Sequence, residues 1–216
     1  MDAKQAYEVL KKYKQHENAL QYCGGFIPLY EEIMKHVPAS KRTLDIGCAY
    51  GMLSLMLADR GDKVVGADMT KQFTSMSMFK DHGIEFETVN LEKDPVPGGF
   101  DLIMLTEVLE HLNSNPLPTI KKLYDSLNKG GAIVCTTPDK AIWGETTSMN
   151  DGRVKGLWND LETWREIPEY KGKWKDQHTF HYDQFELVSL FSEAGFAIEK
   201  VETILKFSHI LVGRKL

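Results

Sequence analysis

Short apolar runs alternate with longer segments of helical period along most of the chain. Most of the short runs show no strict alternation of apolar and polar residues, which is typical of strands that are buried on both faces. Strands are therefore predicted at Arg42–Ile46, Lys63–Ala67, Ile84–Val89, Phe100–Leu105, Gly131–Thr136, Ala197–Thr203 and Leu205–Val212.

Between these strands, apolar residues recur three or four positions apart, as they do in amphipathic helices. Strands that alternate with helices form a parallel sheet with helices on both faces. A tight turn separates the last two strands, so they are expected to pair as an antiparallel hairpin at one edge. The predicted fold class is α/β, a Rossmann-like doubly wound sheet of seven strands, mostly parallel with an antiparallel C-terminal hairpin. Helices are predicted at Leu53–Ala58, Gln72–Asp81, Val108–Leu112, Pro118–Leu127 and Asp183–Ala194.

Two regions lie outside this alternation. Residues 3–20 have the pattern of an amphipathic helix, and Ile27–Val37 have that of a second helix, which ends at the following proline. The interval 139–177 breaks the rhythm and contains all four tryptophans. We interpret 1–216 as one domain, with N-terminal helices in 1–38 and an aromatic-rich insertion at 139–177. The insertion is expected to be a lid over the site, or else a surface subdomain anchored by its indoles.

Composition narrows the class of protein. The net charge of −5 provides no basic field for binding a polyanion, so RNA is disfavoured as a partner. The three cysteines, Cys23, Cys48 and Cys135, are too widely spaced for a zinc site and odd in number, which favours a reducing compartment. The N-terminus lacks the apolar core of a signal peptide, and no apolar run approaches membrane-spanning length. We expect a cytoplasmic protein without membrane contact.

The stretch from Thr43 to Thr70 reads as a strand, a glycine turn, a helix and a second strand that ends in an acid. In an open parallel sheet, ligands bind at the carboxyl ends of the strands. A pyrophosphate at this turn would be repelled by Asp45, which suits a ligand with a cationic group. Asp68 follows the second strand, where an acid holds ribose hydroxyls. The pattern predicts a ligand with a ribose and positive charge, and S-adenosylmethionine has both.

These residues and four later segments resemble the class I S-adenosylmethionine-dependent methyltransferases. "LDIGCAYG" is similar to the glycine-rich first motif, with Ala49 in place of the middle glycine, and "VVGADMT" is similar to the second motif. Later motifs of the family are similar to residues 88–112, to "LNKGGAIVCTTPD" and to "AGFAIEKVETI". Asn90 stands where the family often has Asp. The resemblance implies cofactor contacts from Asp45, Gly47, Cys48, Gly51, Asp68, Met69, Asn90, Leu91 and Leu105.

A second motif, "TEVLEHL", follows the fourth predicted strand and places Glu107, Glu110 and His111 where a methyl acceptor would lie. On a helix, Glu107 would share a face with Glu110 and His111. The motif resembles the Glu-x-x-Glu-His of ubiquinone-biosynthesis O-methyltransferases and of small-RNA 3′-terminal 2′-O-methyltransferases, and the latter add a later histidine matched by His178. That resemblance implies a divalent metal held by Glu107, Glu110, His111 and His178.

Without a metal, His111 or His178 becomes the catalytic base, because histidine titrates near neutral pH. The structural alternative is that the acids complement a helix N-terminus and His111 packs locally. His181 is expected to be a surface residue or to lie behind the site.

The function predicted from these observations is methyl transfer from S-adenosylmethionine to a small-molecule acceptor, by O-methylation rather than N-methylation. Charges in 151–176 are balanced, so this interval forms no positive groove, and its aromatic content favours a ring-bearing or glycan acceptor. The alternatives are a metal-dependent RNA 3′-end 2′-O-methyltransferase and a non-catalytic, cofactor-binding regulatory subunit. A nicotinamide-dependent oxidoreductase is disfavoured by Asp45. The acceptor's identity, the metal requirement and the oligomeric state stay open.

Overall fold

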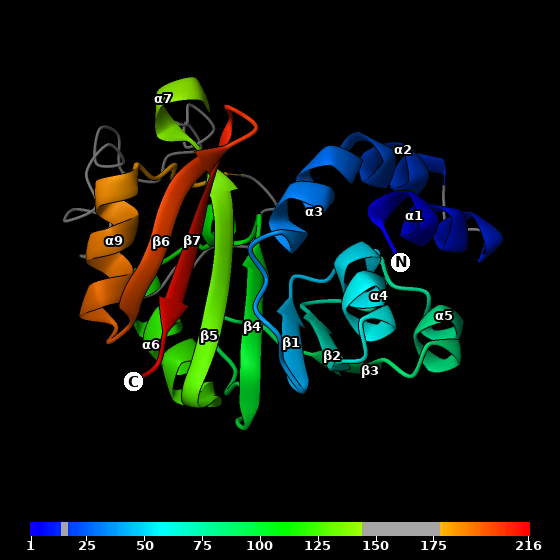
Figure 1. The fold of residues 1–216 in the computed structure, drawn as a ribbon, viewed down its shortest axis with the longest axis horizontal. Coiled ribbons are helices and arrows are strands. Elements are labelled where there is room, and N and C mark those ends of the chain that lie inside the picture. The colour runs from blue at the N-terminus through cyan, green and yellow to red at the C-terminus, as the bar shows by residue number, and fades with distance from the viewer. Residues whose placement is uncertain (14–16, 144–177) are drawn as a thin grey trace.

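A computed structural model describes residues 1–13, 17–143 and 178–216. Seven strands form one sheet in the order β3-β2-β1-β4-β5-β7-β6 (Figure 1). The first five strands in the chain run parallel to one another, and β7 pairs antiparallel with both β5 and β6. The predicted fold class is confirmed. The strands are β1 (Arg42–Ile46), β2 (Lys63–Asp68), β3 (Glu85–Thr88), β4 (Phe100–Thr106), β5 (Leu127–Pro138), β6 (Ala197–Ile204) and β7 (Ser208–Arg214).

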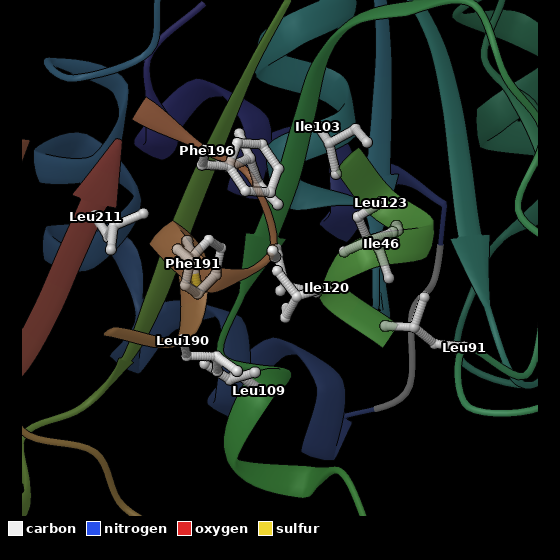
Figure 2. Packing of buried hydrophobic residues seen from close by; sticks show 14 of the residues in the cluster. Ile46, Leu91, Ile103, Leu109, Ile120, Leu123, Leu190, Phe191, Phe196 and Leu211 are labelled. Atoms are coloured by element: carbon white, nitrogen blue, oxygen red, sulfur yellow. The ribbon is translucent and has the colours of Figure 1, made fainter. Parts of the chain in front are cut away.

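Helices cover both faces of the sheet. On one face, α6 and α9 pack on a buried cluster that includes Ile103, Ile120 and Phe191, part of which Figure 2 shows. On the other face, α1, α3, α4 and α5 contribute to a second cluster that includes Leu10 and Met104. The helices are α1 (Ala3–Lys12), α2 (Glu17–Gly25), α3 (Ile27–Met34), α4 (Met52–Asp59), α5 (Met76–Asp81), the 3-10 helix η1 (Leu109–His111), α6 (Pro116–Ser126), α7 (Lys140–Trp143) and α9 (Gln184–Glu193).

Several predicted elements have other bounds in the structure, and three of them illustrate why. The single N-terminal helix predicted over 3–20 is wrong, because α1 ends at Lys12 and α2 begins at Glu17. The helix predicted at Gln72–Asp81 starts only at Met76, where Ser75 caps its first turn by accepting the N–H of Met78. The last strand begins at Ser208, since Leu205 and Lys206 adopt φ of 51° and 66° in the hairpin turn.

The carboxyl ends of β1, β4 and β5 reach the same edge of the sheet, which faces α3 and α7 in Figure 1. The order of the strands reverses between β1 and β4, because β2 and β3 extend the sheet on one side of β1 and β4 and β5 extend it on the other. Ligands bind at such a point in doubly wound sheets. Residues 144–177 of the predicted insertion, with three of its tryptophans, lie outside the described residues. Within the described part of the chain, no helix combines the length and the apolar character needed to cross a membrane.

Candidate functional site

The turn after β1 is built on left-handed backbone. Gly47, Ala49 and Gly51 have φ of 69°, 43° and 83°. The N–H groups of Gly47 and Cys48 donate to the carbonyl of Ala67 in β2, at 2.8 and 3.1 Å, which holds the turn against the neighbouring strand. A Cβ on Gly47 would lie 2.3 Å from Cγ2 of Val108, so glycine is required there by packing as well as by φ. The same contact brings the turn after β4 directly against the glycine turn.

Two carboxylates flank this turn, as the sequence predicts. Asp68 lies half-buried at the end of β2, and its Oδ2 accepts the backbone N–H of Ala49 at 3.0 Å. Asp45 is fully buried beneath the turn and accepts the hydroxyl of Ser54 on α4 at 2.5 Å. Burial raises the pKa of Asp45 to about 7; Ser54 opposes this rise and the charge of Asp68 adds to it. Asp68 therefore offers a ligand its carboxylate at the surface, whereas Asp45 acts from below.

The other predicted cofactor residues fall into two groups. Met69 is 36% exposed beside Asp68, and Asn90 is half-buried after β3, with its Oδ1 accepting the N–H of Glu92 at 3.1 Å. Cys48, Leu91 and Leu105 are buried. Leu105 has no exposed surface in the described structure, so its side chain packs beneath the site.

The segment after β4 departs from the predicted helix. Glu107 has φ of 53°, and only Leu109–His111 form a helical turn, of 3-10 type. The expectation that Glu107 shares a helical face with Glu110 and His111 is therefore wrong. Its Oε1 accepts the hydroxyl of Ser208 on β7 at 3.0 Å, and desolvation raises the pKa of this carboxyl. Among the described residues, Glu107 does not belong to the group of potential metal ligands that contains its predicted partners.

Glu110, His111 and His178 do come together. Each offers one potential ligand atom, and these three atoms lie within 4.8 Å of one another. Glu110 is fully buried; its Oε2 accepts the hydroxyl of Thr137 at 3.1 Å, and its Oε1 lies 3.8 Å from Nε2 of His111. The rings of His111 and His178 meet edge to face with centroids 4.9 Å apart. A carboxylate and two imidazoles from distant parts of the chain thus share one small volume.

A short extended segment, His178–Tyr182, brings His178 there. The N–H and the hydroxyl of Thr179 both donate to the carbonyl of Glu110, at 2.6 and 2.8 Å, and the hydroxyl also donates to the carbonyl of Leu112. Tyr182 forms a parallel bridge with Asp139 at the end of β5. The segment is therefore attached at one end to η1 and at the other to the sheet.

His181 is a residue that the sequence reasoning undervalued. It is buried, with 6% of its surface exposed, and its Nε2 lies 2.8 Å from Nδ1 of His178. The indole of Trp143 lies beside both rings, tilted against them, with ring centroids 5.9 Å from that of His178 and 6.2 Å from that of His181. The signal was the spacing of the two histidines in "HTFH", which does not by itself reveal burial.

Comparison with known proteins identifies the family. A model of the methyltransferase domain family matches residues 15–201. The chain belongs to this family. The fold of the chain is that of the class I S-adenosylmethionine-dependent methyltransferases.

Named relatives of this methyltransferase support the same class. The ubiquinone biosynthesis O-methyltransferase of Idiomarina loihiensis is 31% identical over 110 residues, which cover 47% of this chain and 44% of that protein. The protein of the same name from Pseudomonas aeruginosa is 31% identical over 107 residues, covering 46% and 45%. The chain spans less than half the length of the curated relatives it matches.

Two solved structures share the fold of the methyltransferase. An S-adenosylmethionine-dependent methyltransferase from Mesorhizobium loti superposes with a TM-score of 0.65 at 17% identity, covering 85% of this chain and 95% of that one. The 1,6-didemethyltoxoflavin-N1-methyltransferase of Burkholderia thailandensis, solved with its substrate and S-adenosylhomocysteine, gives 0.63 at 13% identity, covering 87% and 76%.

The residues of the methyltransferase fit S-adenosylmethionine. Gly47 and Gly51 keep side chains out of the turn, and the carboxylate of Asp68 beside it is the kind of acceptor that ribose hydroxyls require. The carboxyl of Asp45 beneath the turn suits a cationic amino-acid portion, because a nearby positive charge favours its ionised form. The donor set of Glu110, His111 and His178 also fits a divalent metal, since carboxylate and imidazole together suit ions such as Mn²⁺.

Proposed function

We propose that this methyltransferase transfers the methyl group of S-adenosylmethionine to an oxygen of a small-molecule acceptor. The observation that carries the proposal is the cluster of Glu110, His111 and His178 beside the glycine turn. Val108, immediately before η1, packs on Gly47, so the cluster lies next to the proposed cofactor site. The name of the relatives, ubiquinone biosynthesis O-methyltransferase, supports oxygen as the methyl acceptor.

On the cofactor side, Asp68 would accept hydrogen bonds from ribose hydroxyls, and the segment Asn90–Leu91 would face the adenine. Asp45 would stabilise the cationic end in its ionised form, which a nearby positive charge favours against the effect of burial. When bound, S-adenosylmethionine supplies a methyl group that its sulfonium already activates. The protein's own task is therefore to hold the acceptor oxygen in line and away from water.

On the acceptor side, His111 and His178 are the residues that can take the hydroxyl proton. Neutral imidazole has a pKa suited to general-base catalysis near neutral pH. Glu110 lies 3.8 Å from the Nε2 of His111, close enough to stabilise the positive charge that a protonated ring would carry. The same three side chains would hold a divalent metal, which lowers the pKa of a hydroxyl that it binds.

An RNA end with two neighbouring hydroxyls is the alternative acceptor. The pattern His178-x-Phe180 and the motif around Glu110 favour it, whereas the position of Glu107 does not, because its carboxylate accepts from Ser208 instead of joining the cluster. The net charge of −5 also disfavours a polyanionic acceptor.

A methyl-transfer assay with labelled cofactor tests the proposal. Catechol, which has two neighbouring hydroxyls, serves as the small-molecule acceptor. A short RNA with a free 3′-terminal ribose serves as the alternative acceptor. We expect methylation of catechol. If the metal is required, the rate should fall more than about tenfold in chelator and recover when Mg²⁺ or Mn²⁺ is returned. Full activity in chelator would instead assign the reaction to His111 or His178 as a base.

Calorimetry with S-adenosylhomocysteine separates cofactor binding from catalysis. Asp68→Ala should weaken binding by about 1.5–3 kcal/mol, as expected for the loss of hydrogen bonds to a charged group. Tight binding without transfer to either acceptor would favour a regulatory subunit. Methylation of the RNA alone would contradict the small-molecule proposal.

A further inference from the structure

We propose that His181 is a positioning residue that fixes the tautomer of His178, so that Nε2 of His178 acts toward the site. The inference rests on the role proposed above for His178 and adds a residue that contacts neither acceptor nor cofactor. His181 was expected to lie at the surface or behind the site, and the structure buries it against His178.

The geometry of the pair is that of a single hydrogen bond between two rings. Nδ1 of His178 lies 2.8 Å from Nε2 of His181, and the ring planes cross at 83° with centroids 5.1 Å apart. Two neutral imidazoles can share only one proton at this contact, because each neutral ring carries one N–H. One of the two nitrogens therefore donates, and the other accepts.

The chemistry of the site selects the direction. If Nδ1 of His178 donates, Nε2 keeps its lone pair and can accept a proton or bind a cation. If Nδ1 accepts, Nε2 carries the proton and can do neither. We infer the first arrangement, in which His181 accepts through Nε2 and carries its own proton on Nδ1. Histidines that bind metals are commonly oriented by a partner on the other ring nitrogen in this way.

Neighbouring residues hold this hydrogen bond in place. His181 is buried, and the indole of Trp143 lies beside both rings, with its Nε1 donating to the carbonyl of Phe207 at 3.1 Å. Thr179 and Tyr182 attach the backbone of the segment on either side of His181. A hydrogen bond between partly buried groups is electrostatically stronger than one in water.

Nuclear magnetic resonance of histidine-labelled protein in chelator reads the tautomer directly, without acceptor, cofactor or metal. His178→Gln and His181→Gln spectra assign the two residues among the seven histidines. At mildly alkaline pH, the wild type should show His178 with its proton on Nδ1 and a bare Nε2. A wild-type His178 protonated on Nε2 would overturn the proposal.

Two variants separate positioning from general damage. His181→Gln keeps an amide near the position of Nε2, and the amide can donate or accept, whereas His181→Met fills similar space without a hydrogen bond. We expect His181→Met to lose the Nδ1–H tautomer of His178 and to weaken Mn²⁺ binding, measured by calorimetry, about 10- to 100-fold. His181→Gln should retain the tautomer and stay within about threefold of the wild-type affinity.

His82→Gln is the matched control, because His82 caps α5 on the other face of the sheet. In the transfer assay, kcat should fall for His181→Met while the KM for S-adenosylmethionine stays unchanged. An unaltered tautomer and kcat in His181→Met, or equal losses in the Met and Gln variants, would overturn the proposal. If the wild type binds no Mn²⁺, the metal no longer belongs to the proposed function. The tautomer of His178 would still decide the role of His181.

Discussion

At the scale of single residues, the most unusual group is the buried carboxyl of Asp45. The hydroxyl of Ser54 donates to its side chain, and burial raises its pKa from 3.8 to about 7. A carboxyl whose pKa is higher in the folded than in the unfolded protein binds more protons when folded. The free energy of unfolding therefore decreases as pH rises from about 4 to about 7, and this contribution is constant above that range.

Asp45→Asn should remove this pH dependence while preserving the acceptor for Ser54. Relative to the wild type, the variant should gain stability between about pH 5 and pH 8, by up to about 4 kcal/mol for a shift of this size. Urea unfolding at several pH values measures the difference. The exposed Asp125→Asn is the control, and parallel curves for wild type and Asp45→Asn would contradict the assignment.

Residue types and spacing predicted the glycine turn and the meeting of Glu110, His111 and His178, but not the places of Glu107 and His181. The prediction of Gly47 and Gly51 as turn residues succeeded because left-handed backbone favours glycine. Glu107 was misplaced because its own φ of 53° is not encoded by any pattern of apolar residues. His181 was undervalued because its burial depends on Trp143 and on the path of a distant segment.

At the scale of elements, the contact between η1 and the segment His178–Tyr182 organises the acceptor side. Thr179 is fully buried, and its hydroxyl donates to carbonyls of Glu110 and Leu112. These carbonyls belong to the end of a short 3-10 turn, which has few hydrogen bonds of its own. The position of His178 relative to His111 therefore depends on this junction.

Thr179→Val should detach the hydroxyl contacts while keeping the shape of the side chain. We expect a loss of about 1–2 kcal/mol in the free energy of unfolding, because the carbonyls lose buried donors. Methyl transfer should decrease more than cofactor affinity, because the hydroxyl of Thr179 attaches the segment of His178 to η1 and does not hold Asp68 or the glycine turn. Thr179→Ser, which retains the hydroxyl, should remain close to wild type, and equal effects of Val and Ser would argue for packing instead.

Element types were predicted well where periodicity was local. The parallel strands and the C-terminal hairpin follow from runs of apolar residues, although the hairpin turn uses Leu205 and Lys206 at positive φ without any glycine. The junction at Thr179 could not be predicted, because it joins residues almost seventy positions apart by hydrogen bonds to backbone. The pattern of apolar residues predicts burial and secondary structure, and hydrogen bonds between a side chain and a distant backbone depend on neither.

At the scale of the whole molecule, the sheet separates two apolar clusters, and the N-terminal helices belong to one of them. Leu10 on α1 and Leu29 on α3 share the second cluster with Leu55 of α4 and Met104 of β4. Leu10 has no exposed surface. The N-terminal helices are therefore expected to unfold together with the sheet.

Leu10→Ala should lower the free energy of unfolding by about 2–5 kcal/mol, because it leaves a cavity in a closely packed region. Circular dichroism and tryptophan fluorescence should report the same midpoint in denaturant. Leu216→Ala, at a side chain that is 76% exposed, is the matched control and should have little effect. Two separate transitions would show that the helices form an independent unit.

The bridge between Asp139 and Tyr182 affects which part of the sequence can change without disturbing the sheet. The chain leaves the sheet at Asp139 and pairs with it again at Tyr182, so these two residues are neighbours in space. Closing a longer or shorter loop between fixed ends changes the free energy only slowly with length. Residues 144–177, which exclude Trp143, His178 and His181, could therefore be exchanged for those of another methyltransferase, and a new acceptor preference acquired, while the histidines, the strands and the glycine turn keep their places.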